Sequence, residues 1–340
     1  MGAEKMGAAE KGAEEKGAEE KGAEQTRAQW LVPLLAAAAL FALPVVLTPY
    51  TQDLVMKIAI YAIFALSLEL LVGMTGLVSL GHAAFLGIGA YVTVLAAGDS
   101  GGSVAAVLPL AVLCAAAYAA IVGALSLRTK GVYFIMVTLA FAQMAYFVFH
   151  DTKFAGGSDG LFLYAKPTLG LINLDKKPDL YAAVMGSLVG TWALLALIGR
   201  SRFGHALAGI RANEQRMRAA GFATFAYKLT AFVIAGALAG LAGFLLAVKD
   251  GAVNPELMSW HQSGAVLLML ILGGIGSLRG AVIGAVAFTL LTELFQSEAL
   301  LGPLAAHWQL SLGLAIIGFV ALLPKGLIGL TARIARRAHG

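Results

Sequence analysis

The residues best suited to chemistry lie in a basic stretch at positions 200–228. This stretch holds six Lys or Arg residues and a single Glu, and it lies between two runs of twenty residues that carry no charge. Arg211, Glu214 and Arg218 are spaced so that one helix would stack them as a charge ladder on one face, with Met217 on a neighbouring apolar stripe. A short amphipathic helix in water beside a membrane domain is a surface that a soluble partner can grip. The first hypothesis is therefore a membrane subunit driven from the cytoplasm.

Motifs for catalysis and nucleotide binding are missing from the sequence. No Gly-Lys dipeptide occurs, so the phosphate-binding loop of ATPases is absent and any ATPase must be another polypeptide. No His, Cys, Asp and Glu residues cluster with metal-ligand spacing, and the common protease and esterase motifs are also absent. We therefore expect a protein that is not an enzyme and that binds no cofactor and no metal.

Composition predicts an all-α polytopic membrane protein. Of 340 residues, 59% are hydrophobic and 13% are charged, which is too few charges to cover the surface of a soluble domain. The 41 glycines suit close helix packing in lipid, and the single cysteine rules out a disulfide framework. The net charge of +5 does not indicate nucleic acid as a partner, because the basic residues follow membrane orientation instead.

Charge-poor runs predict ten transmembrane spans. The runs are 30–48, 56–72, 77–97, 103–127, 131–149, 180–199, 229–248, 262–275, 280–292 and 308–323. A full crossing needs about 20 residues. Because the eighth and ninth runs are shorter, they are candidates for broken or re-entrant helices, and the expected count is eight to ten.

The positive-inside rule places both termini in the cytoplasm. In this orientation 18 of the 24 Lys and Arg residues face the cytoplasm. The six on the outside are Lys57, Lys153, Lys166, Lys176, Lys177 and Lys249. The regions that follow are a disordered, low-complexity cytoplasmic tail at 1–29, a transmembrane domain at 30–324 with a cytoplasmic loop at 200–228 and a periplasmic loop at 150–179, and a basic cytoplasmic tail at 325–340.

Ten spans divide into two halves of five, and an odd number per half forces the halves into opposite orientations. This inverted repeat is common in transporters. The third span of each half is glycine-rich, which points to the substrate pathway, and tight packing through small residues is the alternative. The glycines are Gly81, Gly87 and Gly89 in the first half, and Gly273, Gly274 and Gly276 in the second.

Two polar residues within the spans are candidates for function. Glu69 is the one carboxylate inside a predicted span, where a charge costs about 2.5–3.5 kcal/mol and normally faces a wet cavity or a partner. Because Glu69 lies near the inner end of its span, snorkelling to the interface is the alternative. His82 is either a gate or substrate contact, or a core histidine that donates to a backbone carbonyl.

Two outer segments are candidates for contact with an external protein. The loop at 150–179 is the longest external segment and could dock a periplasmic binding protein, although a solvated loop with balanced charges fits equally well. The sequence Asn254-Pro255-Glu256 would meet an extracellular partner or form a simple turn.

Four segments together resemble the permease subunits of ATP-binding cassette (ABC) uptake systems for branched-chain, or hydrophobic, amino acids. They are GLVSLGHAAFLGIGAY at 76–91, GVYFIMVTLAFAQM at 131–144, RFGHALAGIRANE with AYKLTAFVIAGALAGLAG at 202–243, and LILGGIGSLRGAVIGA at 270–285. The resemblance runs over roughly 55–330 and is closer to the longer of the two permeases that such systems usually pair.

The resemblance implies one subunit of a heteromeric importer in the bacterial inner membrane. Its partners would be two cytoplasmic ATP-binding subunits, a second permease subunit in a heterodimer, a periplasmic substrate-binding protein and the lipid bilayer. Transport would occur by alternating access, as closure of the ATPase pair pulls on a short helix in the loop that corresponds to 203–221.

The residue pattern and the family resemblance together predict two groups of functional residues. Those expected to couple the permease to the ATPase are Arg211, Glu214, Met217, Arg218 and Gly221. Those expected along the translocation pathway are Glu69, Ser79, Gly81, His82, Gly273 and Gly274.

The chain departs from the family pattern at some of these positions. His205 stands where a second Arg is frequent, and Glu69 stands where a polar amide is common. A carboxylate that faced the pathway would repel a substrate carboxylate, so permeases for urea or short amides remain an alternative. From other classes, an autonomous secondary transporter or channel, or a non-transporting membrane scaffold, also stays open.

Overall fold

A computed structural model describes residues 48–169, 172–298, 302–323 and 326–329. The tail predicted at 1–29 and almost all of the first predicted span lie outside these residues, as does most of the C-terminal tail. The chain divides into two compact units, Met1–Gln52 and Asp53–Gly340. The described part of the first unit is 48–52, and everything that follows concerns the second.

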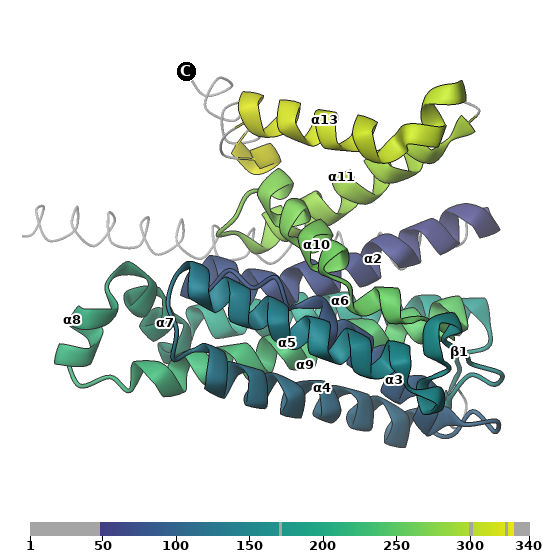
Figure 1. The fold of residues 1–340 in the computed structure, drawn as a ribbon, viewed down its shortest axis with the longest axis horizontal. Helices are drawn as coiled ribbons and strands as arrows, with labels where there is room; N and C mark the ends of the chain where they lie inside the picture. The colour runs from purple at the N-terminus through teal and green to yellow at the C-terminus, as the bar shows by residue number, and fades with distance from the viewer. Residues whose placement is uncertain (1–47, 170–171, 299–301, 324–325, 330–340) are drawn as a thin grey trace, which may run out of the picture. The chain divides into compact units, whose positions relative to one another are not determined.

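Helices dominate the described residues (Figure 1). The long helices are α2 (Pro49–Glu69), which continues as the π-helix η2 (Leu70–Thr75), α4 (Val104–Ser126), α5 (Val132–Asp151), α6 (Lys177–Arg200), α9 (Thr224–Asp250), α11 (Leu278–Gln296) and α13 (Trp308–Leu322). The shorter helices are α3 (Ala83–Ala97), α7 (Arg202–Ala212), α8 (Glu214–Ala219) and α10 (Trp260–Gly273). The 3-10 turns are η3 (Lys153–Ala155), η4 (Gly157–Asp159), η5 (Pro255–Met258) and η6 (Gly302–His307).

This architecture confirms the prediction of an all-α polytopic membrane protein. Within the described residues, seven helices are long and apolar enough to cross a membrane, and α3 and α10 are shorter apolar helices. The ninth predicted span was expected to be too short, but α11 has 19 residues and meets the length that a crossing needs. The eighth, α10, is short as expected, with 14 residues. The total of ten spans and the inverted repeat stay predictions.

Two predicted span boundaries were wrong. The second span was predicted to begin at 56, with Lys57 counted among the outer residues, whereas α2 begins at Pro49 and Lys57 lies well inside it. The ninth was predicted to end at 292, whereas α11 continues past Glu293 to Gln296. Glu69 is therefore not the one carboxylate within a span. The helices continue past these charges because Lys57 Nζ and Glu293 Oε1 pair at 2.8 Å, so each charge has a partner.

The core is built by α3, α4 and α9, which pack closely through small residues. A side chain at Gly243 of α9 would collide with the carbonyl of Leu86 in α3, and one at Gly89 would collide with the carbonyl of Gly240. Nearly all of α3 is buried, whereas α4, α5 and α6 keep broad apolar faces exposed. Close backbone approach through glycine is how helices associate in lipid, where no hydrophobic drive holds them together.

The third predicted span is not helical throughout, contrary to the sequence prediction. Gly76, with φ +74°, ends η2 in the left-handed conformation, and α3 begins only at Ala83. The intervening loop is held by polar side chains, since Ser79 Oγ accepts from Gly81 N–H at 3.2 Å and Ser263 Oγ of α10 accepts from Ala83 N–H at 3.0 Å. A glycine-rich run of this kind therefore contains a break that leaves backbone groups to be satisfied from another helix.

Short strands join two segments at the end of the helices opposite to α7 and α8 (Figure 1). Strand β1 (Leu161–Phe162), from the predicted loop 150–179, pairs antiparallel with β4 (Ala252–Val253). Within the same loop, β2 (Thr168–Leu169) pairs antiparallel with β3 (Ile172–Asn173). Pro255 of the Asn254-Pro255-Glu256 sequence begins the 3-10 helix η5, which packs against α3 and α5.

The close approach of α3 and α9 predicts that Gly243→Ala destabilises the protein. The added methyl group collides with a backbone carbonyl, which cannot rotate away, and overpacking of this kind typically costs about 1–3 kcal/mol. Thermal unfolding of the full chain in detergent would show a lower Tm. Gly186→Ala in α6, where a methyl group meets no atom within 4 Å, is the matched control and should leave the Tm unchanged or raise it. Equal Tm values for the two variants would contradict the packing argument.

Candidate functional site

The basic stretch folds into α7 and α8, between the C-terminal end of α6 and the N-terminal end of α9. Ser201 caps α7, because its Oγ accepts from the backbone N–H of Gly204 at 3.2 Å. Three apolar side chains of α7 are buried and pack this helix against η2, α6 and α9; they are Ala206, Leu207 and Ile210. Arg202 and His205 remain exposed on the other face, so the amphipathic helix predicted from the sequence is present.

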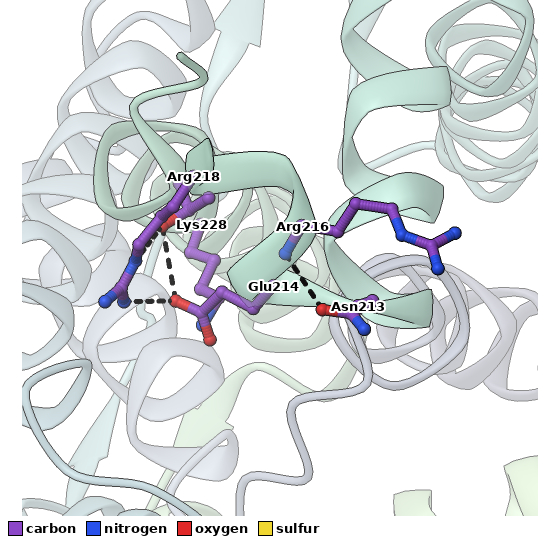
Figure 2. Close-up of polar contacts among 6 residues, drawn as sticks. Asn213, Glu214, Arg216, Arg218 and Lys228 are labelled. Atoms are coloured by element: carbon purple, nitrogen blue, oxygen red, sulfur yellow. Dashed lines mark hydrogen bonds and ion pairs between the residues drawn. The ribbon is translucent and has the colours of Figure 1, made fainter. Parts of the chain in front are cut away.

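A break at Asn213 separates α7 from α8. The backbone of Asn213 is extended (φ −159°, ψ 98°), and its side-chain oxygen accepts from Arg216 N–H at 2.9 Å, which makes it the N-cap of α8 (Figure 2). Arg211 therefore lies on a different helix from Glu214 and Arg218, and the prediction of one continuous charge ladder is wrong. Asn competes with helical hydrogen bonding through its own side chain, and this signal was available in the sequence.

Glu214 is the centre of a polar cluster that joins α8 to α9. Its carboxylate accepts from Arg218 Nη2 at 2.6 Å and from Lys228 Nζ at 2.7 Å, and these partners converge on it in Figure 2. Thr224, the first residue of α9, donates to Glu214 Oε1 at 3.2 Å and accepts from Arg218 Nε at 3.1 Å. Arg216 points away from this cluster (Figure 2). The two cations thus fix the position of α8 relative to the start of α9.

The electrostatics of the cluster keep Glu214 ionised. Partial burial by itself would raise the pKa of this carboxyl, but the hydrogen bonds and positive charges of Lys228 and Arg218 outweigh burial and lower the pKa to about 2. The negative charge at Glu214 also lies in the first turn of α8, where a helix favours an acidic residue.

Arg211 ties α7 to the end of the membrane helix α2. Its guanidinium Nη1 donates to the carbonyl of Gly73 in η2, and its aliphatic chain lies against Gly76. Carbonyls in the last turn of a helix lack partners within the helix, and a cation there is favourable. The predicted coupling residue Arg211 is therefore engaged with the membrane helices and does not stack with Glu214.

The remaining predicted coupling residues shape α8. Gly221, with φ +88°, closes the helix in a Schellman motif, because Phe222 N–H donates to Met217 O at 3.1 Å and Gly221 N–H donates to Arg218 O at 2.9 Å. The Met217 side chain covers Gly209 of α7, where any larger residue would collide with its sulfur. Met217 thus packs α8 against α7, and Gly221 turns the chain from α8 toward α9.

Glu69, predicted on the pathway, lies at the same junction as Arg211. It is 2% exposed, and its Oε1 accepts from Gly276 N–H at 2.8 Å in the turn between α10 and α11. The carboxylate also occupies the space beside Gly73, so it fills the gap that this glycine leaves. Its position rules out snorkelling to the interface, because the side chain is enclosed and bonded to a backbone amide.

Ser79, Gly81 and His82 lie together in the loop before α3. His82 is fully buried and its ring stacks on Phe64. Its Nε2 forms a hydrogen bond with Ser67 Oγ at 2.8 Å. Since the Ser67 hydroxyl donates its proton to Phe64 O at 2.7 Å, His82 Nε2 is the donor to Ser67. The partner is thus a hydroxyl and not the backbone carbonyl that the core-histidine reading expected. A side chain at Gly81 would collide with the carbonyl of Thr138 in α5.

Gly273 and Gly274 lie where α10 turns into α11. A side chain at Gly273 would collide with the carbonyl of Gly280, and Gly274 has φ +113°. Both glycines are therefore required by the tight turn between these helices. The close packing expected as one alternative is present, and a role of either residue on the pathway stays a prediction.

An open cavity of about 450 Å³ lies beside Arg211, between η2, the end of α6 and α7. Its walls are mainly small residues with one guanidinium, and they are Gly73, Met74, Gly199, Gly204, Ala208, Arg211 and Ala212. Within the residues that the structure describes, no group of three or more His, Cys, Asp or Glu side chains could hold a metal ion.

Comparison with known proteins places this arrangement in a family. The profile of the branched-chain amino acid transport system permease component matches residues 50–323. The chain belongs to this permease family. Membership makes the protein a multi-pass membrane transport subunit, which is not an enzyme.

Individual relatives agree with the family match. The high-affinity branched-chain amino acid transport system permease protein LivM of Escherichia coli (strain K12) is 30% identical over 326 residues, which cover 89% of this chain and 75% of the relative. LivM of Salmonella typhimurium is 29% identical over 85% of this chain and 72% of its own length. The autoinducer 2 import system permease protein LsrC of Yersinia enterocolitica is 30% identical over 132 residues, 37% of this chain and 36% of the relative. No solved structure matches the chain.

Some residues of the site were not found from the sequence. Asn213 and Thr224 carried local signals as helix starts, whereas Lys228 was counted only among the basic residues of the stretch 200–228. The acceptor of Arg211, the carbonyl of Gly73, is 138 residues away and gives no signal in side-chain type.

The cluster predicts that Glu214→Gln loosens α8 without unfolding the membrane helices. Glutamine keeps the shape but leaves Arg218 and Lys228 without a counter-charge, so we expect faster amide exchange over 213–224 by mass spectrometry. Gln215→Ala on the exposed side of α8 is the matched control and should exchange like the wild type. Equal exchange in Glu214→Gln and the wild type would show that the ion pairs do not hold α8.

The low pKa of Glu214 also predicts how the wild type responds to acid. A depressed carboxyl pKa stabilises the docked state fully above the unfolded value of about 4.3. That stabilisation is lost only as the pH falls towards the folded value of about 2. Protection of α8 should therefore stay constant between about pH 8 and pH 5. A loss of protection within this range, after correction for intrinsic exchange rates, would contradict the assignment.

Proposed function

We propose that this chain is a permease subunit of an ATP-driven ABC importer that moves branched-chain and other hydrophobic amino acids across the bacterial inner membrane. Energy comes from two separate ATP-binding subunits in the cytoplasm. The chain pairs with a second, different permease subunit and receives substrate from a periplasmic binding protein. Family membership and the transport function for which the LivM relatives are named support this proposal.

The observation that carries the mechanism is the attachment of α7 and α8 to membrane helices at two points. Arg211 holds the end of η2 through the Gly73 carbonyl, and Glu214 holds the start of α9 through Lys228. A force on α8 is therefore transmitted to α2 and α9, and α9 packs against α3 and α4 in the core. Rigid elements that move together are what alternating access by rocking requires.

The free face of the loop suits a soluble ATPase. Arg202, Arg216 and Phe222 are exposed there, and the stretch 200–228 carries six basic residues against one acidic residue. Such a surface attracts an acidic groove on a partner and lies on the cytoplasmic side by the positive-inside rule. The cavity beside Arg211 has room for a side chain of that partner.

The short helices support the inverted repeat within this proposal. Helix α3 has 15 residues and α10 has 14. No α-helix occupies the segment before either of them, which is 76–82 for α3 and 251–259 for α10; the second of these holds the 3-10 helix η5. They meet where Ser263 of α10 accepts from the first N–H of α3. Paired broken helices are the feature that marks substrate pathways in transporters with inverted repeats.

The position of Glu69 removes the argument for urea or a short amide as the substrate. That alternative needs the Glu69 carboxylate to face the pathway and repel a substrate carboxylate. Glu69 is 2% exposed and is bonded to Gly276 N–H, so it does not oppose an amino acid.

Reconstituted transport tests the function directly. The whole complex in proteoliposomes, loaded with ATP on the ATPase side, should take up labelled leucine, and unlabelled isoleucine or valine should compete while urea and acetamide should not. Uptake by the lone chain, together with purification from native membranes without any ATPase, would overturn the proposal.

The attachment of Arg211 predicts an uncoupled variant. Arg211→Ala removes a charged hydrogen bond worth about 1.5–3 kcal/mol, so leucine uptake per ATP hydrolysed should fall about tenfold while hydrolysis continues. Arg128→Ala removes the same charge from the exposed turn between α4 and α5, outside the loop 200–228, and should keep the wild-type ratio. If both variants retain that ratio, Arg211 does not transmit force.

A further inference from the structure

A second polar cluster lies on the membrane helices. It is far in sequence from the loop 200–228 and has no part in the contacts described for that loop. Lys57 and Tyr61 stand one turn apart on α2, so both point to the same side of the helix. Lys57 Nζ pairs with Glu293 Oε1 of α11 at 2.8 Å, and Tyr61 Oη accepts from Gln262 Nε2 of α10 at 3.0 Å. Three helices therefore contribute one positive charge, one negative charge and two neutral polar groups.

The cluster lies near the outer ends of its helices. Glu293 is three residues from the end of α11, and Gln262 is two residues after the start of α10. Lys57 is eight residues after Pro49, where the 27-residue span of α2 and η2 begins, and Tyr61 lies one turn further along α2. A site at this level would meet a substrate as it enters from the outer side.

The two charges are paired but not enclosed. The side chains of Lys57 and Glu293 keep 36% and 27% of their surface exposed, in contrast to Glu69, which is sealed at 2%. A partly exposed ion pair at the end of membrane helices is stable where water solvates both charges. The exposed side of this pair is therefore a wet surface, such as a transport route along α2, α10 and α11.

We propose that Lys57 and Glu293 form the site that receives the zwitterionic end of an α-amino acid during translocation. The Lys57 ammonium group takes the substrate carboxylate and the Glu293 carboxylate takes the substrate ammonium group, so their mutual ion pair opens and two new pairs form. Net charge does not change, and neither charge is left unpartnered in the membrane. This inference rests on the proposed function as an amino acid importer.

The neighbouring contacts suit such a site. The Tyr61–Gln262 hydrogen bond holds α10 to α2 one turn below the ion pair, while α10 and α11 are joined by the turn that contains Gly276. Gly276 is bonded to Glu69 at the junction where Arg211 also binds. Separation of Lys57 from Glu293 would move α2 relative to α11. The other end of α2 continues into η2, which binds Arg211 of the loop 200–228, and the other end of α11 follows the turn that contains Gly276.

The alternative is a static tie between α2 and α11, and protection by substrate from a charged thiol reagent distinguishes the two. Lys57→Cys and Glu293→Cys, each in a Cys114→Ser background, are labelled in the whole complex by a membrane-impermeant methanethiosulfonate. Both should react at least about tenfold faster than Leu113→Cys, which is 64% exposed on the apolar face of α4. Leucine-loaded binding protein should slow labelling at Lys57→Cys but not at Leu113→Cys. Reaction rates equal to those of Leu113→Cys, or no slowing by leucine-loaded binding protein at Lys57→Cys, would overturn the site.

Charge variants give a second, independent test through leucine uptake. Lys57→Met and Glu293→Gln should each lower uptake about tenfold or more, as expected when a charged contact is lost. The double variant Lys57→Met/Glu293→Gln leaves no lone charge, so it should assemble like the wild type and still fail to transport. The exchanged pair Lys57→Glu/Glu293→Lys can still form an ion pair between α2 and α11, but the positive and negative charges have changed places. It should therefore not restore uptake.

The outcomes separate the two proposals. Wild-type uptake by the double variant or by the exchanged pair shows a structural tie and overturns the zwitterion site. If the wild-type complex itself moves no amino acid, the proposed function fails, and the labelling rates still report whether Lys57 and Glu293 line a wet route.

Discussion

The bond between Arg211 and the carbonyl of Gly73 is the contact on which the rest of the structure depends. It joins a helix outside the membrane to the last turn of a membrane helix, where carbonyls lack partners within the helix. Beside it, Glu69 holds the turn between α10 and α11 through Gly276. One basic and one acidic side chain thus bring α2, α7 and the α10–α11 turn to a single junction.

Three physically different environments hold charged side chains near or within the membrane. Glu69 is enclosed and its carboxylate takes a backbone amide, which suits a group that fixes a turn in place. Lys57 and Glu293 are paired across two helices and remain partly open, which suits a group that exchanges partners. Glu214 of α8 follows a third pattern beside the start of α9, with two cations that lower its pKa to about 2 and keep it charged at every physiological pH.

Glycine sets the geometry through which these contacts act. At Gly243 and Gly89 it lets α3 and α9 approach until backbone atoms touch, and at Gly76 it ends η2 in a conformation that other residues avoid. The result is a tightly packed core of α3, α4 and α9 beside two breaks, at 76–82 and at the α10–α11 turn. A rigid core with breaks at defined points is able to move as a few bodies, which agrees with the proposed rocking mechanism.

The sequence by itself determined the membrane class, most span positions and the amphipathic loop, because these depend on local composition and on the spacing of charges. It also indicated Arg211, Glu214 and Gly221 as important. Only the tertiary structure decided what they touch, since Arg211 meets a carbonyl 138 residues away and Lys57 meets Glu293 over 236 residues. Backbone acceptors carry no mark in the sequence, and a charge beside an apolar run looks like a span end until its distant partner is known. The physical reason is that helix formation is local, whereas the partner of a buried charge is chosen by packing.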